Sequence, residues 1–171
     1  VPQKMEFEIQ EQLPHNPKYF TQGLEFVGNI LYEGTGEYGT SALYAYEPKK
    51  GKVLKEKSID KQYFGEGITI LNDRIYQLTY QNRKGFVWDL QTFEPVREFG
   101  FESAEGWGLT NDGIHLIMSD GTAFLTYLDP TDFSVVKRVE VVSDQQAITN
   151  LNELEYVDGY IFANIWQSNY V

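Results

Sequence analysis

Four stretches of the chain repeat the same alternation of apolar and polar positions. Each contains glycine or acidic residues near its start, enters an apolar run, passes through a tight turn and continues into a second apolar run. They begin at Phe20, Phe64, Glu105 and Asn152 and read FTQGLEFVGNILYEG, FGEGITILNDRIYQLT, EGWGLTNDGIHLIMSDG and NELEYVDGYIFANIW. Two short apolar runs around a turn indicate a pair of antiparallel strands in each stretch.

The stretches recur at a nearly constant spacing. Leu24, Ile68, Leu109 and Leu154 occupy equivalent positions, and successive positions are 44, 41 and 45 residues apart. A repeat of this length, built from short strands, is typical of the blades of a β-propeller. The spacing therefore predicts an all-β fold with blades of about 43 residues.

A second hairpin completes each of the first three repeats. The corresponding segments begin at Ser41, Gly85 and Ala123 and read SALYAYEPKKGKVLKEKSI, GFVWDLQTFEPVREFGF and AFLTYLDPTDFSVVKRVEV. Their acidic turn residues Glu47, Asp89 and Asp129 follow one another at 42 and 40 residues. Each blade is thus expected to hold four strands, and no segment sustains a helical period.

Composition agrees with a β-protein in one domain. Aromatic residues make up 15% of the chain, with 12 Tyr and 11 Phe, and such side chains fill half-buried pleated surfaces well. No Pro-rich or Ser-rich linker interrupts the 171 residues. We therefore expect a single domain over residues 1–171.

Charge and cysteine content exclude several classes of protein. The formal net charge of -11 would repel the phosphates of nucleic acids and of an anionic membrane. The chain has no Cys, so neither a disulfide framework nor a thiolate metal site can form, and His15 and His115 are too few for a His-rich metal site. No apolar run is long enough to span a membrane.

The two ends of the chain predict an incomplete ring of blades. The segment Lys4–Gln10 (KMEFEIQ) alternates like a strand that would pair into the last blade, and Gln167–Val171 reads as the start of a further strand. The fourth blade is therefore half present, and its open edges favour pairing with other strands. We expect either a truncated or proteolysed piece of a longer propeller, or closure by self-association with another copy.

One glycine motif matches a nucleotide-binding pattern. Gly34, Gly36 and Gly39 form GTGEYG, but the dinucleotide fingerprint requires a helix immediately after the glycines, so that the helix N-terminus meets the pyrophosphate. The residues that follow, SALYAY, read as a strand. The glycines are therefore expected to form a tight connection between the second and third strands of the first blade.

Polar and aromatic residues recur where the first strand of each repeat begins. In propellers these strand starts converge at one end of the central channel, so we expect an acidic pocket lined by aromatic rings. Its expected members are Phe20, Gln22, Phe64, Glu66, Glu105, Trp107, Asn152, Glu153 and Glu155.

Seven motifs in this order and spacing resemble one family. FTQGLEF, EGTGEYGTS, FGEGIT, EGWGLT, MSDG, LNELE and ANIW look like the plant- and bacterial-type glutaminyl-peptide cyclotransferases, over residues 14–171. The resemblance implies a five-bladed propeller, periplasmic or secreted. It also implies an aminoacyltransferase that converts the N-terminal glutamine of peptides to pyroglutamate and releases ammonia, without a catalytic metal or other cofactor.

The resemblance also implies roles for individual residues. Glu66 of FGEGIT corresponds to the essential glutamate of the family, and it would act as general acid and base. The substrate-binding positions fall on Phe20, Gln22, Phe64, Trp107, Asn152 and Trp166. Aromatic surroundings would raise the pKa of the Glu66 carboxyl by desolvation, and the two amides could donate hydrogen bonds to a developing oxyanion.

The chain departs from the family in two places, and other functions stay open. Tyr80 stands where many members carry Trp, and a C-terminal blade with VLNGIA-like and TGK-like stretches is absent. A lactonase-like propeller hydrolase would hold a divalent cation on channel carboxylates such as Glu66, Glu153 and Glu155. A non-catalytic propeller that binds peptides or carbohydrates is the third hypothesis. Trp107 and Trp166 could also be core residues with no role in a pocket.

Overall fold

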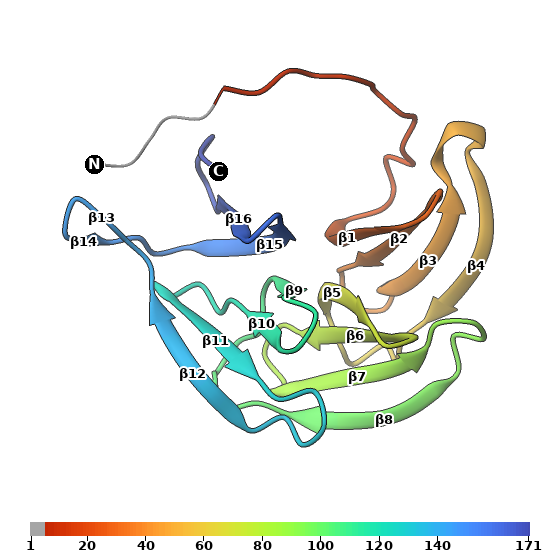
Figure 1. Ribbon diagram of the computed structural model, residues 1–171. Helices are drawn as coiled ribbons and strands as arrows, with labels where there is room; N and C mark the ends of the chain where they lie inside the picture. Colours follow the sequence, from red (N-terminus) through yellow and green to blue (C-terminus); the bar gives the residue numbers. More distant parts are fainter. Residues whose placement is uncertain (1–5) are drawn as a thin grey trace.

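The computed structural model describes residues 6–171 and consists of antiparallel β-sheets arranged around a centre (Figure 1). Three of the sheets have four strands each, in sequence order, and two further sheets have two strands each. This confirms the predicted all-β fold. The first blade comprises β1 (Thr21–Val27), β2 (Ile30–Thr35), β3 (Ala42–Glu47) and β4 (Lys52–Ser58). The second comprises β5 (Gly65–Leu71), β6 (Arg74–Thr79), β7 (Lys84–Asp89) and β8 (Pro95–Gly100).

The third blade and the half blade follow the same plan. β9 (Leu109–Asn111), β10 (Leu116–Met118), β11 (Phe124–Leu128) and β12 (Val135–Glu140) form the third blade, and β15 (Leu151–Val157) and β16 (Tyr160–Ile165) form the half blade. A small hairpin of β13 (Val142–Ser143) and β14 (Gln146–Ala147) connects them. The innermost strands β1, β5, β9 and β15 lie nearest the centre (Figure 1), and each contacts the next one along the chain.

Turn residues explain where the strands reverse. Asn72 and Asp73 both have positive φ, 51° and 58°, which is the conformation of the tight two-residue hairpin turn. The longer turns are shaped by Asp89 and Asp129, whose carboxylates accept backbone N–H groups two residues later. The GTGEYG glycines connect β2 to β3, as the sequence predicts, and no helix follows them.

The core lies between neighbouring blades, and the middle strands of the second blade are buried on both faces. In the second blade, Ile75 and Trp88 pack toward the first blade, whereas the alternate residues Tyr76 and Val87 pack toward the third. Strands β6 and β7 are therefore almost continuously buried. Burial of each large apolar side chain contributes roughly 1.5–3 kcal/mol. Trp88 is also a core residue.

Close contacts between the innermost strands depend on glycines at equivalent positions. A Cβ on Gly23 would lie 2.5 Å from the backbone nitrogen of Ile68, and one on Gly67 would lie 2.5 Å from that of Leu109. A Cβ on Gly108 would lie 2.1 Å from the carbonyl oxygen of Asn152. Each innermost strand can thus approach its neighbour only because the repeat has no side chain there.

Both predicted terminal strands are wrong where the structure describes them. Glu6–Gln10 has no strand, and Lys4 and Met5 lie outside the described residues. Phe7 is 89% exposed, and an alternating segment without a partner strand cannot satisfy its backbone hydrogen bonds as a strand. Gln167–Val171 also forms no strand, because the chain turns after β16 and the Ile165 N–H donates to the Tyr170 carbonyl at 3.0 Å.

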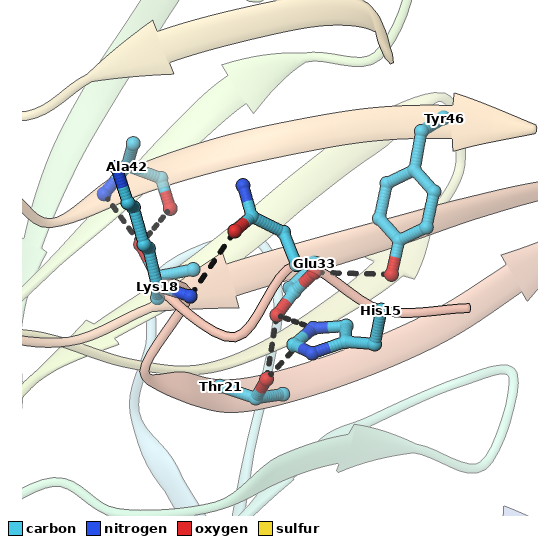
Figure 2. A network of polar contacts seen from close by, with 8 residues as sticks. His15, Lys18, Thr21, Glu33, Ala42 and Tyr46 are labelled. Carbon is cyan, nitrogen blue, oxygen red and sulfur yellow. Dashed lines mark hydrogen bonds and ion pairs between the residues drawn. The ribbon is translucent and has the colours of Figure 1, made fainter. Parts of the chain in front are cut away.

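A buried carboxylate attaches the N-terminal segment to the first blade (Figure 2). Glu33 is fully buried on β2, and its Oε1 accepts a hydrogen bond from the Thr21 hydroxyl at 2.6 Å and lies 2.9 Å from His15 Nε2. The Tyr46 hydroxyl donates to Oε2 at 3.1 Å. Tyr19 stacks on Tyr44 beside this network, with ring centroids 4.1 Å apart. These contacts are consistent with the predicted tethering role of His15.

Tyr46→Phe is expected to lower the free energy of unfolding by roughly 1–3 kcal/mol, because the fully buried Glu33 carboxylate loses one of its donors. Urea unfolding followed by circular dichroism measures the change. Tyr160→Phe is the matched control, since Tyr160 is well exposed on β16, and it should change stability by less than about 0.5 kcal/mol. Equal effects of the two changes would contradict the assigned role of the Tyr46 hydroxyl.

Candidate active site

Three of the four innermost strands carry a β-bulge at their first residues. In β1 the pairing with β2 skips Gln22, and in β5 the pairing with β6 skips Glu66 and Gly67. In β15 the pairing with β16 skips Asn152 and Glu153. A bulge releases a residue from the regular alternation and redirects its side chain. The polar residues predicted for the site therefore stand at equivalent, irregular positions of three blades.

Backbone contacts hold these strand starts together. The Gly67 N–H donates to the Trp107 carbonyl at 2.8 Å, which joins the start of the second blade to that of the third. The Ser119 hydroxyl donates to the Asn152 carbonyl at 2.7 Å and accepts from the Gly108 N–H at 2.8 Å. Glu66 and Asn152 thus lie on strands, whereas Trp107 lies at the end of the loop before β9, where its backbone is fixed by hydrogen bonds with Gly67 and Ser119.

Phe64 is the centre of an aromatic group at this end of the strands. Its ring lies 6.1 Å from that of Phe20, 5.5 Å from Tyr38 and 5.8 Å from Tyr80, measured between centroids. Gly36 lies directly against it, since a Cβ there would be 2.3 Å from Phe64 Cε1 and 3.1 Å from Gln22 Cγ. The structure thus brings together Phe20, Gln22 and Phe64, as the sequence predicts for the pocket, and adds Tyr38.

A second aromatic pair comes from the third blade and the half blade. The rings of Trp107 and Trp166 meet edge to face at 5.6 Å. Gly121 packs on Trp107, where a Cβ would lie 2.8 Å from the indole ring. Trp107 is half-buried and Trp166 is 49% exposed, so neither is enclosed in the core between the blades.

Glu66 is a buried carboxyl with an altered charge state. Burial and, to a smaller extent, the charge of Glu105 raise the pKa of Glu66 to about 9. The group is therefore neutral at pH 7, in contrast to an ordinary glutamate. A neutral carboxyl can donate a proton or a hydrogen bond, which an ionised one cannot.

Three more carboxyls lie on the innermost strands β1 and β15. Glu25 accepts hydrogen bonds from the Thr69 hydroxyl at 2.8 Å and the Ile70 N–H at 2.9 Å, yet burial raises its pKa to about 7. Both oxygens of Glu153 are enclosed and have no hydrogen-bond partner among residues 6–171, and burial together with the charge of Glu155 raises its pKa well above the ordinary value. Burial also raises the pKa of Glu155.

These carboxyls do not form a metal centre by themselves. Over residues 6–171 no three His, Asp or Glu side chains come close enough together to hold one metal ion.

Two cavities, of about 290 and 440 Å³, are lined by outer-strand and loop residues such as Phe133 and Arg97, and neither is lined by a predicted site residue. In the same part of the chain no helix is long and apolar enough to cross a membrane.

Two residues near the candidate site, Tyr38 and Glu25, were not predicted from the sequence. Tyr38 was missed, although its position between Gly36 and Gly39 in a tight connection is a weak signal. Glu25 was also missed, because it reads as an exposed residue of an alternating strand. Asp112 and Asp120 shape turns, since both accept backbone N–H groups of their own turns.

The repeated blades and the polar strand starts around their centre define a β-propeller. The WD40 domain of Neurospora crassa Pan2 superimposes with a TM-score of 0.58 at 14% identity, over 70% of this chain and 36% of that chain, which is a likeness of fold alone. The family model of the glutamine cyclotransferases matches residues 1–171, so the chain belongs to the glutamine cyclotransferase family.

Two relatives support this membership. The glutaminyl-peptide cyclotransferase of Arabidopsis thaliana is 39% identical over 165 residues, which are 96% of this chain and 52% of the relative. The crystal structure of Myxococcus xanthus glutaminyl cyclase has a TM-score of 0.86 and 32% identity, over 94% of this chain and 68% of that chain. This chain thus spans about half the length of the curated plant relative.

Proposed function

We propose that the chain carries the catalytic carboxyl of a glutaminyl-peptide cyclotransferase, which converts N-terminal glutamine of peptides to pyroglutamate and releases ammonia. The observation that carries the proposal is Glu66, a buried carboxyl on a β-bulge, with its pKa raised to about 9. Its neighbour in sequence, Phe64, is surrounded by three aromatic rings. Family membership supports the reaction class.

The reaction requires one group that both gives and takes a proton. The α-nitrogen of the substrate attacks the γ-carbonyl carbon, and the bond from that carbon to the amide nitrogen breaks. The leaving nitrogen must gain a proton to depart as ammonia, and the attacking nitrogen must lose one. Glu66 in its neutral form gives its proton to the leaving nitrogen and, once ionised, takes the proton of the α-nitrogen, which restores the neutral carboxyl.

The other predicted residues stabilise the negative charge of the intermediate or fix the conformation of the substrate. The side-chain amides of Gln22 and Asn152 donate hydrogen bonds to the oxygen that becomes negative in the tetrahedral intermediate. Phe20, Phe64, Trp107 and Trp166 hold the flexible glutamine side chain in a folded conformation, in which the nitrogen lies near the carbonyl carbon. None of these steps uses a metal ion, so the reaction is proposed to be metal-independent.

Ammonia release from the dipeptide Gln-Ala, measured with EDTA present, tests the proposal. The assay compares the 171-residue chain with a version extended at its C-terminus to the length of the bacterial relative. Ammonia and pyroglutamyl-alanine in equal amounts are expected. A folded, extended protein that releases no ammonia would sink the proposal and favour a binding propeller. Activity lost in EDTA and restored by a divalent cation would contradict metal independence.

A further inference from the structure

The loop between β8 and β9 carries a carboxylate that the proposed chemistry leaves unused. Glu105 lies in this loop, which leads from the outer strand of the second blade to the innermost strand of the third. Its Oε2 accepts a hydrogen bond from Trp107 Nε1 at 2.8 Å, and its Oε1 accepts one from Gln81 Nε2 at 3.0 Å. Donors from two loops, β6–β7 and β8–β9, thus hold one half-buried carboxylate in a fixed orientation.

The partners of Glu105 leave its negative charge uncompensated. Both donors are neutral, and no Lys, Arg or His of residues 6–171 forms an ion pair with this carboxylate. A carboxylate offers about four acceptor positions, so the hydrogen bonds from Gln81 and Trp107, together with that of the neutral Tyr80 hydroxyl, leave capacity for one further donor. A fixed anion with free acceptor positions is suited to bind a cation.

Glu105 also lies close to the reacting carboxyl, because the N–H of Gly67, the residue after Glu66, donates to the carbonyl of Trp107, two residues after Glu105, at 2.8 Å. Its charge raises the pKa of Glu66, after burial, and it raises the pKa of the neighbouring Tyr80 hydroxyl as well, again after burial. The indole that it holds, that of Trp107, meets Trp166 edge to face. The carboxylate therefore lies beside both the acid and the aromatic rings of the site.

The substrate brings a positive charge that Glu66 cannot balance. A free peptide α-amino group has a pKa of about 7.7–8.0 and is largely protonated at neutral pH. The same nitrogen is positive again in the tetrahedral adduct, before it loses its proton. Since Glu66 is neutral at this pH, a second, ionised acceptor is needed near the α-nitrogen, and aromatic faces beside it add a favourable cation–π contribution.

We infer that Glu105 is the anionic subsite for the substrate α-ammonium group, an inference that rests on the proposed cyclotransferase function. Its carboxylate binds the protonated amine in the ground state. The amine releases one proton to solvent before it attacks, and the carboxylate then stabilises the positive nitrogen that forms during attack. Glu105 thereby gives the site its preference for a free N-terminus over an acylated or amine-free glutamine.

Isothermal titration of a variant pair with two ligands tests this inference. All proteins carry Glu66→Gln, which prevents turnover, and the ligands are Gln-Ala and its α-desamino analogue, 4-carbamoylbutanoyl-alanine. Adding Glu105→Gln is expected to weaken Gln-Ala binding tenfold or more, because a charge-assisted hydrogen bond is lost. Binding of the desamino ligand should change less than about threefold.

Two further variants distinguish recognition of the substrate amine by Glu105 from a purely structural role of this residue. Glu102→Gln is the matched control, since Glu102 lies in the same loop and pairs with Arg138 at the surface, and it should leave both affinities unchanged. Glu105→Asp keeps the charge and should keep the preference for the amine. Equal weakening of both ligands by Glu105→Gln, or no weakening of either, would overturn the inference. The proposed cyclotransferase activity is tested separately, by measuring ammonia release with the protein that retains Glu66.

Discussion

Glu66→Gln is expected to reduce ammonia release from Gln-Ala by a factor of about 10² to 10⁴ or more, because the only group assigned to carry the proton is replaced by one that cannot ionise. Glutamine has nearly the same shape as a protonated glutamate, so binding of the substrate should change little. The loss should therefore appear in kcat, with KM nearly constant. Glu25→Gln serves as the control, since Glu25 is a second buried carboxyl of an innermost strand with no assigned role in the reaction.

The same substitution is expected to change how stability depends on pH. The folded-state pKa of Glu66 is raised to about 9, whereas an unfolded glutamate has an ordinary value, so between these two pH values the folded state binds more protons than the unfolded state. The contribution of the neutral carboxyl is fully present below the unfolded pKa, and it decreases as pH rises toward 9, by at most about 1.4 kcal/mol per pH unit.

Urea unfolding of wild type and Glu66→Gln at several pH values measures this effect. Above pH 5 the stability of the wild type should fall relative to that of the variant, so Glu66→Gln should be the more stable protein at pH 8. Parallel pH dependences of the two proteins would show that Glu66 ionises freely in the folded state. An active Glu66→Gln protein would remove the residue from the mechanism altogether.

Gly108→Ala is expected to lower the free energy of unfolding by about 3 kcal/mol or more, or to prevent folding. The new Cβ would lie 2.1 Å from the Asn152 carbonyl oxygen and 2.7 Å from the Glu153 Cα. Both are backbone atoms of the half blade, so they cannot move aside by rotation of a side chain. The third blade and the half blade would have to separate, and the strand starts that carry Trp107 and Asn152 would separate with them.

Gly100→Ala is the matched control for this prediction. A Cβ at Gly100, at the end of β8, would meet no atom closer than the Arg83 carbonyl oxygen at 3.7 Å, and its φ is not positive. Stability should change by less than about 1 kcal/mol, since alanine also reduces the entropy of the unfolded chain. Equal destabilisation by the two substitutions would contradict the close approach of the innermost strands at Gly108.

Much of the blade architecture could be predicted because it depends on local signals. Asn72 and Asp73 mark a hairpin turn by residue type, and the alternation on either side of them fixes which residues pair. The predictions for the two terminal segments were wrong because strand formation there depends on a partner strand and not on local signals. Lys4–Gln10 alternates like a strand, but a strand requires a partner, and none is present among the described residues.

The sequence predicted which residues meet at the candidate site better than it predicted their hydrogen bonds and burial. Phe20, Gln22 and Phe64 come together as expected, and Glu66 lies at the predicted start of an innermost strand. The sequence gives no indication that Gln81 and Trp107 would orient Glu105, since Gln81 is 24 residues away and lies in another blade. It also does not predict that Glu153 would be enclosed without a hydrogen-bond partner among residues 6–171.

The sequence by itself determined the period of the repeat, the tight turns, the lack of a sustained helical period and the motifs of the glutamine cyclotransferase family. Each of these depends on residues that are close together in the chain. Only the tertiary structure decided that Glu66 is neutral, that Glu105 is fixed beside it and that three glycines allow the innermost strands to touch. These properties arise from desolvation and from contacts between neighbouring blades, and residues some 40 positions apart carry no local signal of them.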